Sequence, residues 1–516
     1  MATLETPASA GTSNGGGADG QIPVENPATG QIIGHVPDMG AEEVARLVKA
    51  ARAAQPAWAE MGYDARAKVF KRARKWLVDN RDRVARTIVE ETGKTREDAM
   101  LTEVLFIADS FGYWAKSAPK HLKDEKVKSH SPFMLGKKLI VRYNPRGVIG
   151  VIGVIGPWNY PLTNCFGDGI SALAAGNAVV FKPSEITPLT TLLMQECMRE
   201  AGLPDGVMQV ATGRGQTGAA LIEHVDYVMF TGSVATGKKV AVKAAETLTP
   251  HSLELGGKDP MIVLRDADVE RAANGSVFWS MANGGQICQA IERVYVEEPV
   301  YDEFVAKVVE KTRALRQGVP GEIGAVDVGA VTFAPQADLM DEHIRDAVAK
   351  GATVLVGGKR GPGPGRFFEP TVVVDVDHTM KLMQDETFGP ILPVMKVRDE
   401  HEALEKANDS RYGLNSSVWT KDIAKGERIA SQIEAGSSCV NDAVANYAAQ
   451  ELPFGGVKES GIGVRHSAAG IRKYSHAHAI LVTRFAMKRE LYWFPFSKRN
   501  AKLLERLLVL MYGRKP

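Results

Sequence analysis

The sequence contains few cysteines, and none of them are paired in a motif. The four thiols, at Cys165, Cys197, Cys288 and Cys439, are far apart and form no Cys-x-x-Cys pattern. The N-terminus also lacks a basic segment followed by an apolar run. Together these absences favour a cytoplasmic protein in a reducing compartment. The 11 histidines include no His-Glu-x-x-His spacing, so we expect no protein-bound metal.

Long apolar runs and an excess of one charge are also missing. No stretch approaches the roughly 18 uninterrupted apolar residues that a membrane-spanning helix requires. Lys and Arg total 63 against 61 Asp and Glu, a formal charge of +2, so no global field points to nucleic acid. A chain of 516 residues, 44% hydrophobic and 24% charged, is typical of soluble protein and long enough for two or more domains.

The first half of the chain predicts a tail, a group of helices and then an α/β domain. Residues 1–20 are rich in Ala, Gly, Ser and Thr and cannot bury enough surface to offset the entropy of ordering, so we expect a disordered tail. From about Ala41 to Ala118 apolar residues recur with a helical period. Short apolar runs then alternate with helical stretches, which favours a doubly wound parallel sheet. The predicted strands are Val148–Ile155, Ala178–Phe181, Val207–Val210 and Tyr227–Phe230.

A second alternation begins near Pro260 and predicts a second α/β domain. Its strand candidates are Met261–Leu264, Thr353–Val356 and Ile391–Met395, with helices at Val300–Leu315 and Pro335–Lys350. Between the early helices and the first sheet, residues 128–146 contain an extended run that ends in a proline-glycine turn signal. We interpret that segment as a hairpin.

One acid and one thiol stand in otherwise apolar, glycine-rich sequence. Glu254 lies in Leu253-Glu254-Leu255-Gly256-Gly257-Lys258, and 34 positions later Cys288 ends the string Gly285-Gln286-Ile287-Cys288. A cysteine can capture an aldehyde carbon covalently, and a carboxylate can activate the water that frees the acyl group. Taken alone, the thiol could be a small buried hydrophobe and the acid a helix cap. The pair straddles the proposed domain boundary, which suits a cleft between domains.

Five further motifs accompany these two in a fixed order along the chain. They are Pro157-Trp158-Asn159-Tyr160-Pro161, Lys182-Pro183-Ser184-Glu185, Phe230-Thr231-Gly232-Ser233, Glu386-Thr387-Phe388-Gly389-Pro390 and Pro453-Phe454-Gly455-Gly456-Val457-Lys458-Glu459-Ser460-Gly461. From about residue 22 to residue 476, the chain resembles the aldehyde dehydrogenase superfamily. Seven ordered motifs are very unlikely to arise by chance.

The resemblance implies an NAD(P)-dependent aldehyde dehydrogenase of the hydrolytic type. Cys288 would be the nucleophile and Glu254 the base that activates water. The Asn159 amide, which could otherwise only stabilise a turn, would hold the oxyanion together with the backbone N–H of Cys288. Relatives that pass the acyl group to coenzyme A generally lack the acid at the Glu254 position. A coenzyme A-acylating enzyme and a non-catalytic structural or binding relative remain as alternatives.

The cofactor site cannot be the standard dinucleotide fingerprint, because the sequence has no Gly-x-Gly-x-x-Gly. Two glycines, Gly232 and Gly237, instead follow a predicted strand where a helix begins, and such an N-terminus can accept a pyrophosphate. The resemblance implies cofactor contacts at Ile155, Pro157, Trp158, Lys182, Ser184, Glu185, Gly218, Thr231, Gly232, Ser233, Leu255, Glu386 and Phe388. Glu386 and Phe388 would hold the nicotinamide ribose. Because Glu185 would face the adenosine ribose and repel a 2′-phosphate, we expect NAD, with NADP as the alternative.

The substrate is predicted to be an apolar aldehyde, aliphatic or aromatic. Relatives that oxidise succinate semialdehyde tend to carry an arginine a few residues beyond the asparagine motif, where it pairs with the distal carboxylate. Here the corresponding stretch, Leu162–Asp168, contains no cation. Candidate channel walls are Cys165, Phe166, Tyr447 and Phe454, although the first three could equally be plain packing.

The remaining segments predict how the chain is divided and what it contacts. The resemblance implies an NAD-binding domain of residues 21–127 and 149–256, a catalytic domain of residues 257–460, and an oligomerisation hairpin of residues 128–148 and 470–484 in a homodimer or homotetramer. Residues 484–516 contain nine Lys or Arg and two acids among aromatic and leucine-rich runs. This C-terminal extension, taken as residues 485–516, can form a basic amphipathic helix on an anionic membrane surface. The alternative is a helix packed over its own domain or a sister subunit.

Overall fold

The computed structural model describes residues 20–146, 150–490 and 492–513. The disordered tail predicted for residues 1–20 lies outside the described residues except for Gly20. The chain divides into two compact units, one of Met1–Leu122 with Asn144–His476 and a smaller one of Lys123–Tyr143 with Ala477–Pro516. Within the described residues, no helix is both long and apolar enough to cross a membrane.

The predicted N-terminal helices are confirmed. They are α1 (Ala41–Glu60), α2 (Gly62–Asp79), α3 (Arg81–Thr92), α4 (Arg96–Asp98), the π-helix η1 (Ala99–Leu105) and α5 (Phe106–His121). Val44 and Val48 of α1 and Phe70, Ala73 and Leu77 of α2 are buried, as their helical spacing predicts. Before these helices, β1 (Gln21–Glu25) and β2 (Ile32–Pro37) pair as a small antiparallel sheet.

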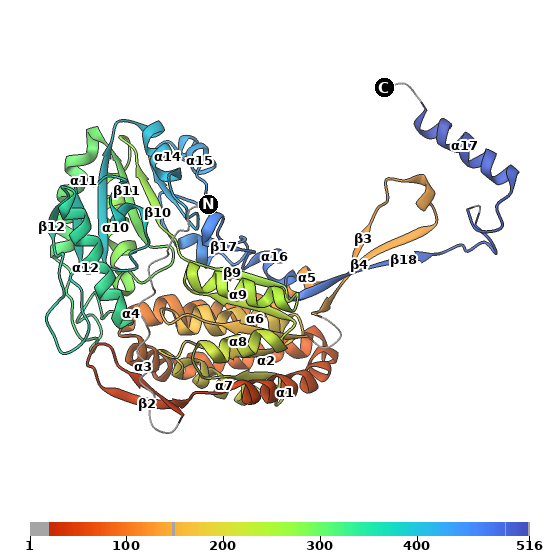
Figure 1. Cartoon of the computed structure of the whole chain (residues 1–516), viewed down its shortest axis with the longest axis horizontal. Helices are drawn as coiled ribbons and strands as arrows, with labels where there is room; N and C mark the ends of the chain where they lie inside the picture. Colours follow the sequence, from red (N-terminus) through yellow and green to blue (C-terminus); the bar gives the residue numbers. More distant parts are fainter. Residues whose placement is uncertain (1–19, 147–149, 491, 514–516) are drawn as a thin grey trace, which may run out of the picture. The chain divides into compact units, whose positions relative to one another are not determined.

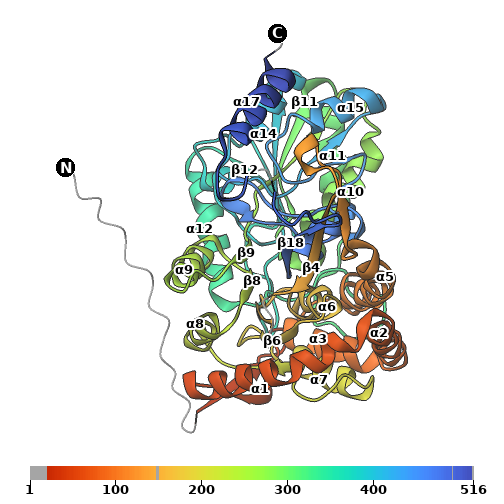
Figure 2. The same ribbon diagram turned by 90° about the vertical axis from the view of Figure 1, so that its right-hand side faces the viewer.

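The first large sheet has six strands in the order β17-β9-β8-β5-β6-β7. The strands are β5 (Val151–Ile155), β6 (Ala178–Lys182), β7 (Met208–Val210), β8 (Tyr227–Thr231), β9 (His251–Glu254) and β17 (Gly461–Ile462). All the predicted runs are strands, while Val148 and Ile149 of the first run lie outside the described residues. Helices α6 (Gly167–Ala174) and α7 (Leu189–Glu200) connect the early strands, and α8 (Gly215–His224) and α9 (Val234–Glu246) connect the later ones. Figure 2 shows α8 and α9 on one side of the strands and α6 on the other.

The second large sheet has seven strands in the order β12-β13-β14-β11-β10-β15-β16. The strands are β10 (Asp259–Val263), β11 (Ile291–Glu297), β12 (Thr353–Val356), β13 (Thr371–Val374), β14 (Ile391–Val397), β15 (Ser417–Trp419) and β16 (Cys439–Val440). The helices around it are α10 (Val269–Met281), α11 (Glu298–Arg313), α12 (Ala334–Ala349), α13 (Lys381–Gln384), α14 (Glu400–Asn408) and α15 (Ile423–Ala430). A second α/β sheet is thus confirmed (Figure 1).

Both sheets are mainly parallel, as predicted, but each has an antiparallel edge strand. The edge strand β12 runs antiparallel to β13, and β17 runs antiparallel to β9. Edge strands can reverse because they need no crossover connection in the sheet. The central strand β11 was not predicted, since it carries Glu292 and Arg293 within an otherwise apolar run. Both side chains are buried in the folded chain, where Glu292 pairs with Lys258 and Arg293 donates to the backbone carbonyl of Lys258.

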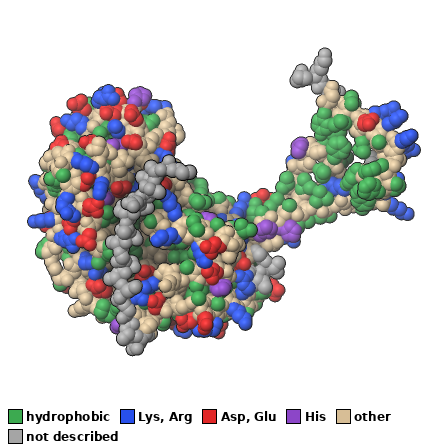
Figure 3. Space-filling view, viewed as in Figure 1, with side chains coloured by type: hydrophobic (Ala, Val, Ile, Leu, Met, Phe, Trp, Pro, Cys, Tyr) green, Lys and Arg blue, Asp and Glu red, His purple; other side chains and the backbone are tan. Residues whose placement is uncertain are grey.

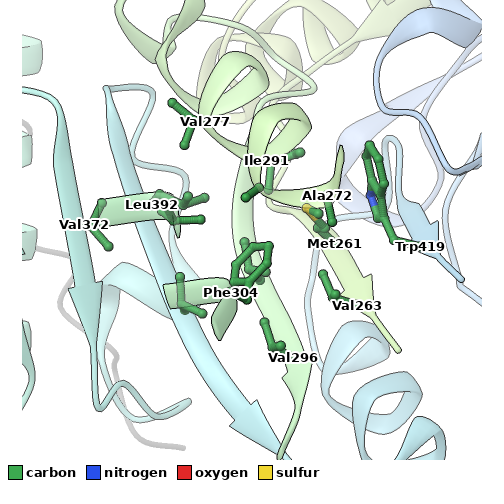
Figure 4. Close-up of a cluster of buried hydrophobic side chains, with 14 of the residues drawn as sticks. Met261, Val263, Ala272, Val277, Ile291, Val296, Phe304, Val372, Leu392 and Trp419 are labelled. Carbon is green, nitrogen blue, oxygen red and sulfur yellow. The ribbon is translucent and has the colours of Figure 1, made fainter. Parts of the chain in front are cut away.

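The core of the second sheet explains why its strands and helices pack as they do. Phe304 of α11 is fully buried against branched residues of the strands, including Val296 and Val372 (Figure 4). Ala272 and Val277 of α10 and Trp419 of β15 belong to the same buried cluster. Alternate residues of β10 and β11 enter this cluster, and the residues between them enter a second cluster on the opposite face. Burial on both faces is what a parallel sheet with helices on each side requires.

The smaller unit contains a three-stranded sheet in the order β18-β4-β3 and a terminal helix. β3 (Glu125–Val127) and β4 (Lys137–Pro145) pair antiparallel, so a hairpin is present, but its first strand lies just before the segment predicted to contain it. β18 (Ser475–Thr483) follows the short helix α16 (Ser467–Arg472), and α17 (Lys498–Tyr512) follows an aromatic segment.

Candidate functional site

The carboxyl ends of four neighbouring strands meet at one edge of the first sheet. β5 lies between β6 and β8, and the chain builds the sheet outward from β5 first on one side and then on the other. The space beyond β5 and β8 is therefore a topological switch point, where open α/β sheets bind ligands. The strands end nearly in register, with Ile155 opposite both Lys182 and Phe230. Residues 157–159, 184–185, 231–233 and 254–255 all lie at this edge.

Cys288 lies in a loop between α10 and β11 whose backbone is tightly constrained. Asn283, Gly284 and Gly285 have positive φ values of 51°, 62° and 72°. A side chain at Gly285 would bring its Cβ within 2.1 Å of the carbonyl carbon of Gly389, so this position needs glycine. The Gln286 side chain fixes the loop from within, since its Nε2 donates to the Asn283 carbonyl at 2.6 Å and its Oε1 accepts from Thr332 N at 2.8 Å.

Cys288 is partly exposed as a residue, but its sulfur is buried and the pKa of its thiol is raised. Burial of the sulfur is the main cause, and the negative charge of Glu254 adds to it. The free thiol is therefore protonated near neutral pH and must lose its proton before it can attack an electrophile.

Asn159 follows β5 and reaches the loop that carries Cys288. Its Nδ2 donates to the Gln286 carbonyl at 2.9 Å, which directs the amide toward the thiol-bearing loop as an oxyanion donor requires. The backbone carbonyl of Asn159 accepts from Lys94 Nζ at 2.8 Å, and Lys94 pairs with Glu103 at 2.7 Å. Both charged side chains are fully buried. Glu103 also accepts from the backbone N–H of Leu162 at 2.8 Å, so the pair fixes the segment on both sides of Tyr160.

Glu254 ends β9 and is the most isolated acid of the site. It is 2% exposed, and its Oε1 has no hydrogen-bond partner among the described residues. Burial raises the pKa of the carboxyl to about 7, while the charge of Arg465 opposes that rise. A carboxyl with this pKa changes protonation near neutral pH, as a general base must.

Glu386 and Phe388 are held at the same site by a second buried ion pair. Lys258 Nζ contacts Glu292 at 2.6 Å, and the two Glu292 oxygens accept from the N–H groups of Thr387 at 2.7 Å and Phe388 at 2.8 Å. Glu386 accepts from Gly257 N at 2.9 Å, and burial raises its pKa to about 8.

The aromatic rings of Trp158 and Phe388 meet edge to face, with centroids 5.3 Å apart. This contact joins the segment after β5 to the segment that contains Glu386.

The same edge of the first sheet, at the carboxyl ends of its strands, also has a helix N-terminus that can bind a dinucleotide. Ser233 caps α9, with its Oγ accepting from Thr236 N at 3.3 Å, and the first turn of that helix is exposed. Gly232 N donates to the Glu254 carbonyl at 3.1 Å, while Leu255 packs over Gly237.

Beside this helix, a Cβ at Gly218 would lie 3.7 Å from Ile155 and 3.8 Å from Lys182. Protein packing therefore does not require glycine there, whereas close approach of a ligand would. Lys182 contacts Glu185 at 3.2 Å, and Ser184 Oγ accepts from Ile186 N at 3.3 Å. The residues present fit an extended, phosphate-containing cofactor.

Comparison with known proteins agrees with this geometry. A model of the aldehyde dehydrogenase family matches residues 15–480. The chain belongs to the aldehyde dehydrogenase family. It is 39% identical over 497 residues to a 4,4′-diapolycopene aldehyde oxidase of Methylomonas sp, covering 95% of this chain and 91% of the relative. It is 41% identical to a putative succinate-semialdehyde dehydrogenase [NADP(+)] of Mycolicibacterium smegmatis, covering 90% and 89%.

Solved structures of the family resemble this aldehyde dehydrogenase closely. A betaine aldehyde dehydrogenase from Staphylococcus aureus in complex with NAD+ superposes with a TM-score of 0.86 at 33% identity, covering 92% of this chain and 93% of the other. Lactaldehyde dehydrogenase from Escherichia coli superposes with a TM-score of 0.85 at 34% identity, covering 90% and 96%. The predicted family and fold class are confirmed.

Two of the predicted channel walls are not at a surface. Cys165 and Phe166 are fully buried, because the π-helix η3 (Pro161–Phe166) turns both into the protein core. Cys165 packs on Gly156, and Phe166 lies between Phe111 and Phe181 with ring centroids 5.8 and 5.7 Å apart. These contacts favour the packing alternative for both residues.

The other two channel candidates belong to an aromatic cluster. Tyr447 and Phe454 meet edge to face at 4.9 Å, and Phe106 lies 5.3 Å from Tyr447. Tyr447 is partly exposed, whereas Phe454 is 1% exposed. The Tyr447 hydroxyl donates to Asn164 Oδ1 at 2.7 Å.

Sequence reasoning missed a buried cation beside this cluster. Arg465 donates to Asp168 Oδ2 at 3.0 Å, to the Tyr447 hydroxyl at 3.2 Å and to the Thr231 hydroxyl. Thr231 is the cross-strand partner of Glu254, so the guanidinium lies one residue from the candidate base. A cavity of about 20 Å³ is lined by Asp168, Arg465, Tyr447 and other residues.

The charge of Arg465 opposes the effect of burial on both candidate catalytic groups. It lowers the pKa of Glu254 and of Cys288, whereas the charge of Asp168 raises the pKa of Glu254. Arg465 lies four positions after the last residue of the final recognised motif. No local pattern links it to Asp168, because the two residues are 297 positions apart.

We expect Arg465→Gln to move the pH dependence of turnover upward. The pKa of Glu254, about 7 in the native protein, rises further when the guanidinium charge is removed, so the rate reaches its plateau at higher pH. The measurement is kcat as a function of pH. Arg465→Lys, which keeps the charge, should shift the profile less.

The double variant Asp168→Asn with Arg465→Gln is the matched control, since it removes opposing charges together and should shift the profile less than Arg465→Gln alone. Thermal unfolding of each variant reports on folding. A lower kcat with an unmoved pH midpoint in Arg465→Gln would show a purely structural role.

Proposed function

We propose that this protein oxidises an apolar aldehyde, aliphatic or aromatic, to the carboxylic acid with NAD as the hydride acceptor. The proposal is supported above all by one observation. Glu254 is a buried acid with an unpartnered oxygen and a pKa of about 7, and its charge acts on the only partly exposed cysteine of the described chain, Cys288. An acid in this state is suited to remove a proton from water.

The chemistry that these residues support has two stages. In the first, the Cys288 thiol releases its proton to solvent and its sulfur forms a bond to the aldehyde carbon. The Asn159 amide and the backbone N–H of Cys288 stabilise the oxyanion, a contribution worth on the order of 3 kcal/mol for one such donor. When bound, the nicotinamide supplies the acceptor for the hydride that leaves this carbon, so that a thioester remains.

In the second stage Glu254 removes a proton from a water molecule, and the water oxygen bonds to the thioester carbon. The bond from carbon to sulfur then breaks and the thiol is restored. The overall conversion takes an aldehyde, water and NAD⁺ to a carboxylic acid, NADH and one proton. A coenzyme A-acylating enzyme would not need Glu254, so this residue favours hydrolysis. A non-catalytic relative would need none of Cys288, Glu254 and Asn159, so the presence of all three favours an enzyme.

The residues proposed to hold the cofactor lie around the switch point. The exposed first turn of α9 and Ser233 would receive the pyrophosphate. Glu185 and Lys182 would face the adenosine ribose, and Glu386 the nicotinamide ribose. The contact between Lys182 and Glu185 offsets part of the carboxylate charge, so we propose NAD as the preferred cofactor with NADP also accepted. Relatives of this chain are named for NADP(+).

Two substrate classes compete, and the pocket favours the apolar one. Tyr447 is in ring contact with Phe106 and with the buried Phe454, so its surroundings are largely aromatic. The nearby Arg465 is already paired with Asp168 at 3.0 Å, which makes it a poor partner for a second carboxylate. Arg465 is nevertheless the observation that favours the second candidate, succinate semialdehyde, which is the aldehyde named for a relative.

We expect Cys288→Ser to abolish steady-state oxidation while NAD binding is retained, because an alcohol is a far weaker nucleophile than a thiolate. Glu254→Gln should produce a burst of NADH followed by slow turnover, since acyl transfer to water loses its base. Rapid-mixing absorbance at the NADH band measures both. Cys439→Ser, which changes a buried thiol in β16, is the matched control and should keep normal activity.

Added coenzyme A should yield no acyl-coenzyme A, and its appearance would support the acylating alternative.

Glu185→Gln should improve kcat/KM with NADP relative to NAD, because the variant no longer repels the 2′-phosphate. Glu196→Gln changes an exposed acid in α7 that pairs with Arg83 and should leave the ratio unchanged. A native enzyme that already prefers NADP would contradict the role proposed for Glu185.

A panel of aldehydes tests the substrate class. Along a series of straight-chain aldehydes, kcat/KM should rise by about fourfold for each methylene that enters an apolar channel, which corresponds to roughly 0.8 kcal/mol. Benzaldehyde should also be oxidised faster than succinate semialdehyde. A preference for succinate semialdehyde that Arg465→Gln removes through KM would support the second candidate instead.

A further inference from the structure

The smaller unit exposes an unusual amount of apolar surface. Among the described residues, half of the large hydrophobic side chains that are exposed belong to this unit, although it comprises only residues 123–143 and 477–516. They are densest between Phe485 and Tyr512. Phe494 is 78% exposed and Leu510 is 69% exposed. An exposed apolar surface of this kind marks a contact with another molecule or with lipid.

The terminal helix α17 separates cations from apolar side chains. Lys498, Lys502 and Arg506 recur at i, i+4 and i+8 and so share one side of the helix. Leu503, Leu507 and Leu510 recur at i, i+4 and i+7 on an adjacent side. No residue of α17 is buried. Figure 3 shows hydrophobic side chains gathered over this unit, with Lys and Arg along one side.

An aromatic segment precedes the helix and continues the same surface. Tyr492, Trp493, Phe494 and Phe496 are all exposed. The Phe494 and Phe496 rings are in tilted contact, with centroids 4.7 Å apart and an interplanar angle of 50°. Trp and Tyr rings are the side chains that favour the headgroup level of a bilayer, since each has an apolar body and a polar tip.

The charge of the segment is strongly positive although the chain as a whole is nearly neutral. Residues 484–513 contain seven Lys or Arg and two acids, against a formal charge of +2 for the chain. One of the two acids, Glu490, pairs with Lys137 at 3.2 Å within the same unit. In the described part of this segment, the charged side chains that remain outside this pair are therefore almost all Lys or Arg.

We propose that the surface formed by Phe485–Tyr512 docks on an anionic lipid bilayer. The leucines of α17 and the aromatic rings would enter the boundary between headgroups and acyl chains, and the flanking Lys and Arg would contact lipid phosphates. A second copy of the chain fits less well, because the centres of protein interfaces are depleted of Lys, whereas here cations flank the apolar face directly. Nucleic acid fits less well because exposed leucines have no partner on it.

Sedimentation of the full-length protein with vesicles tests the proposal. The protein should pellet with vesicles of phosphatidylcholine and phosphatidylglycerol at low salt and stay in solution with phosphatidylcholine alone. Salt at about 0.5 M should release it, because the electrostatic attraction is then screened. The triple variant Lys498→Glu, Lys502→Glu, Arg506→Glu should partition roughly tenfold or more weakly.

The matched control reverses three exposed lysines of the larger unit, Lys49→Glu, Lys71→Glu and Lys239→Glu. It changes the total charge equally and should bind vesicles as the native protein does. Phe494→Ser with Phe496→Ser should weaken binding at both salt concentrations, since it removes the apolar contribution. Lipids brominated near the headgroups should quench part of the tryptophan fluorescence, and Trp493→Phe should abolish that part.

Three results would overturn the proposal. The first is equal binding of the native protein and the triple variant to anionic vesicles. The second is no vesicle binding together with a changed subunit count in the triple variant, measured by sedimentation velocity, which would assign the surface to a second copy. The third is retention of the native protein on DNA with no binding to vesicles.

Discussion

The candidate site depends on an ion pair that is fully removed from solvent. Lys94 and Glu103 neutralise each other at 2.7 Å, and each then binds the backbone of the segment after β5. A buried charge without its partner costs several kcal/mol, so both side chains must hold this one geometry. The consequence reaches the chemistry directly, because the segment they hold contains Asn159, whose amide contacts the loop of Cys288.

A second buried pair does the same for the opposite side of the site. Lys258 and Glu292 fix the backbone of Thr387 and Phe388, and Glu386 precedes them. Arg465 with Asp168 is a third pair, beside Glu254. In each pair the two charges neutralise each other. The carboxyl of Glu254 has no such direct partner among the described residues, and burial raises its pKa to about 7.

The sequence predicted secondary structure best where the hydrophobic pattern along a segment matches the burial of its side chains. Apolar runs such as Tyr227–Phe230 predicted strands that are buried on both faces, and helical spacing in residues 41–118 predicted helices with a buried side. The pattern failed for β11, whose Glu292 and Arg293 look like surface residues in the sequence. For Cys165 and Phe166 the sequence left channel wall and core packing open, and both side chains are buried in the π-helix η3.

The sequence by itself determined the family, the fold class and the set of chemical groups, because the thiol, the acid and the amide each stand in a short motif whose residues are contiguous. Only the tertiary structure decided what surrounds those groups. Asp168 and Arg465 are 297 positions apart, and Lys94 and Asn159 are 65 apart, so no local period or spacing relates them. These contacts exist only when distant segments of the chain pack together, and burial makes the charges of Asp168 and Arg465 require each other.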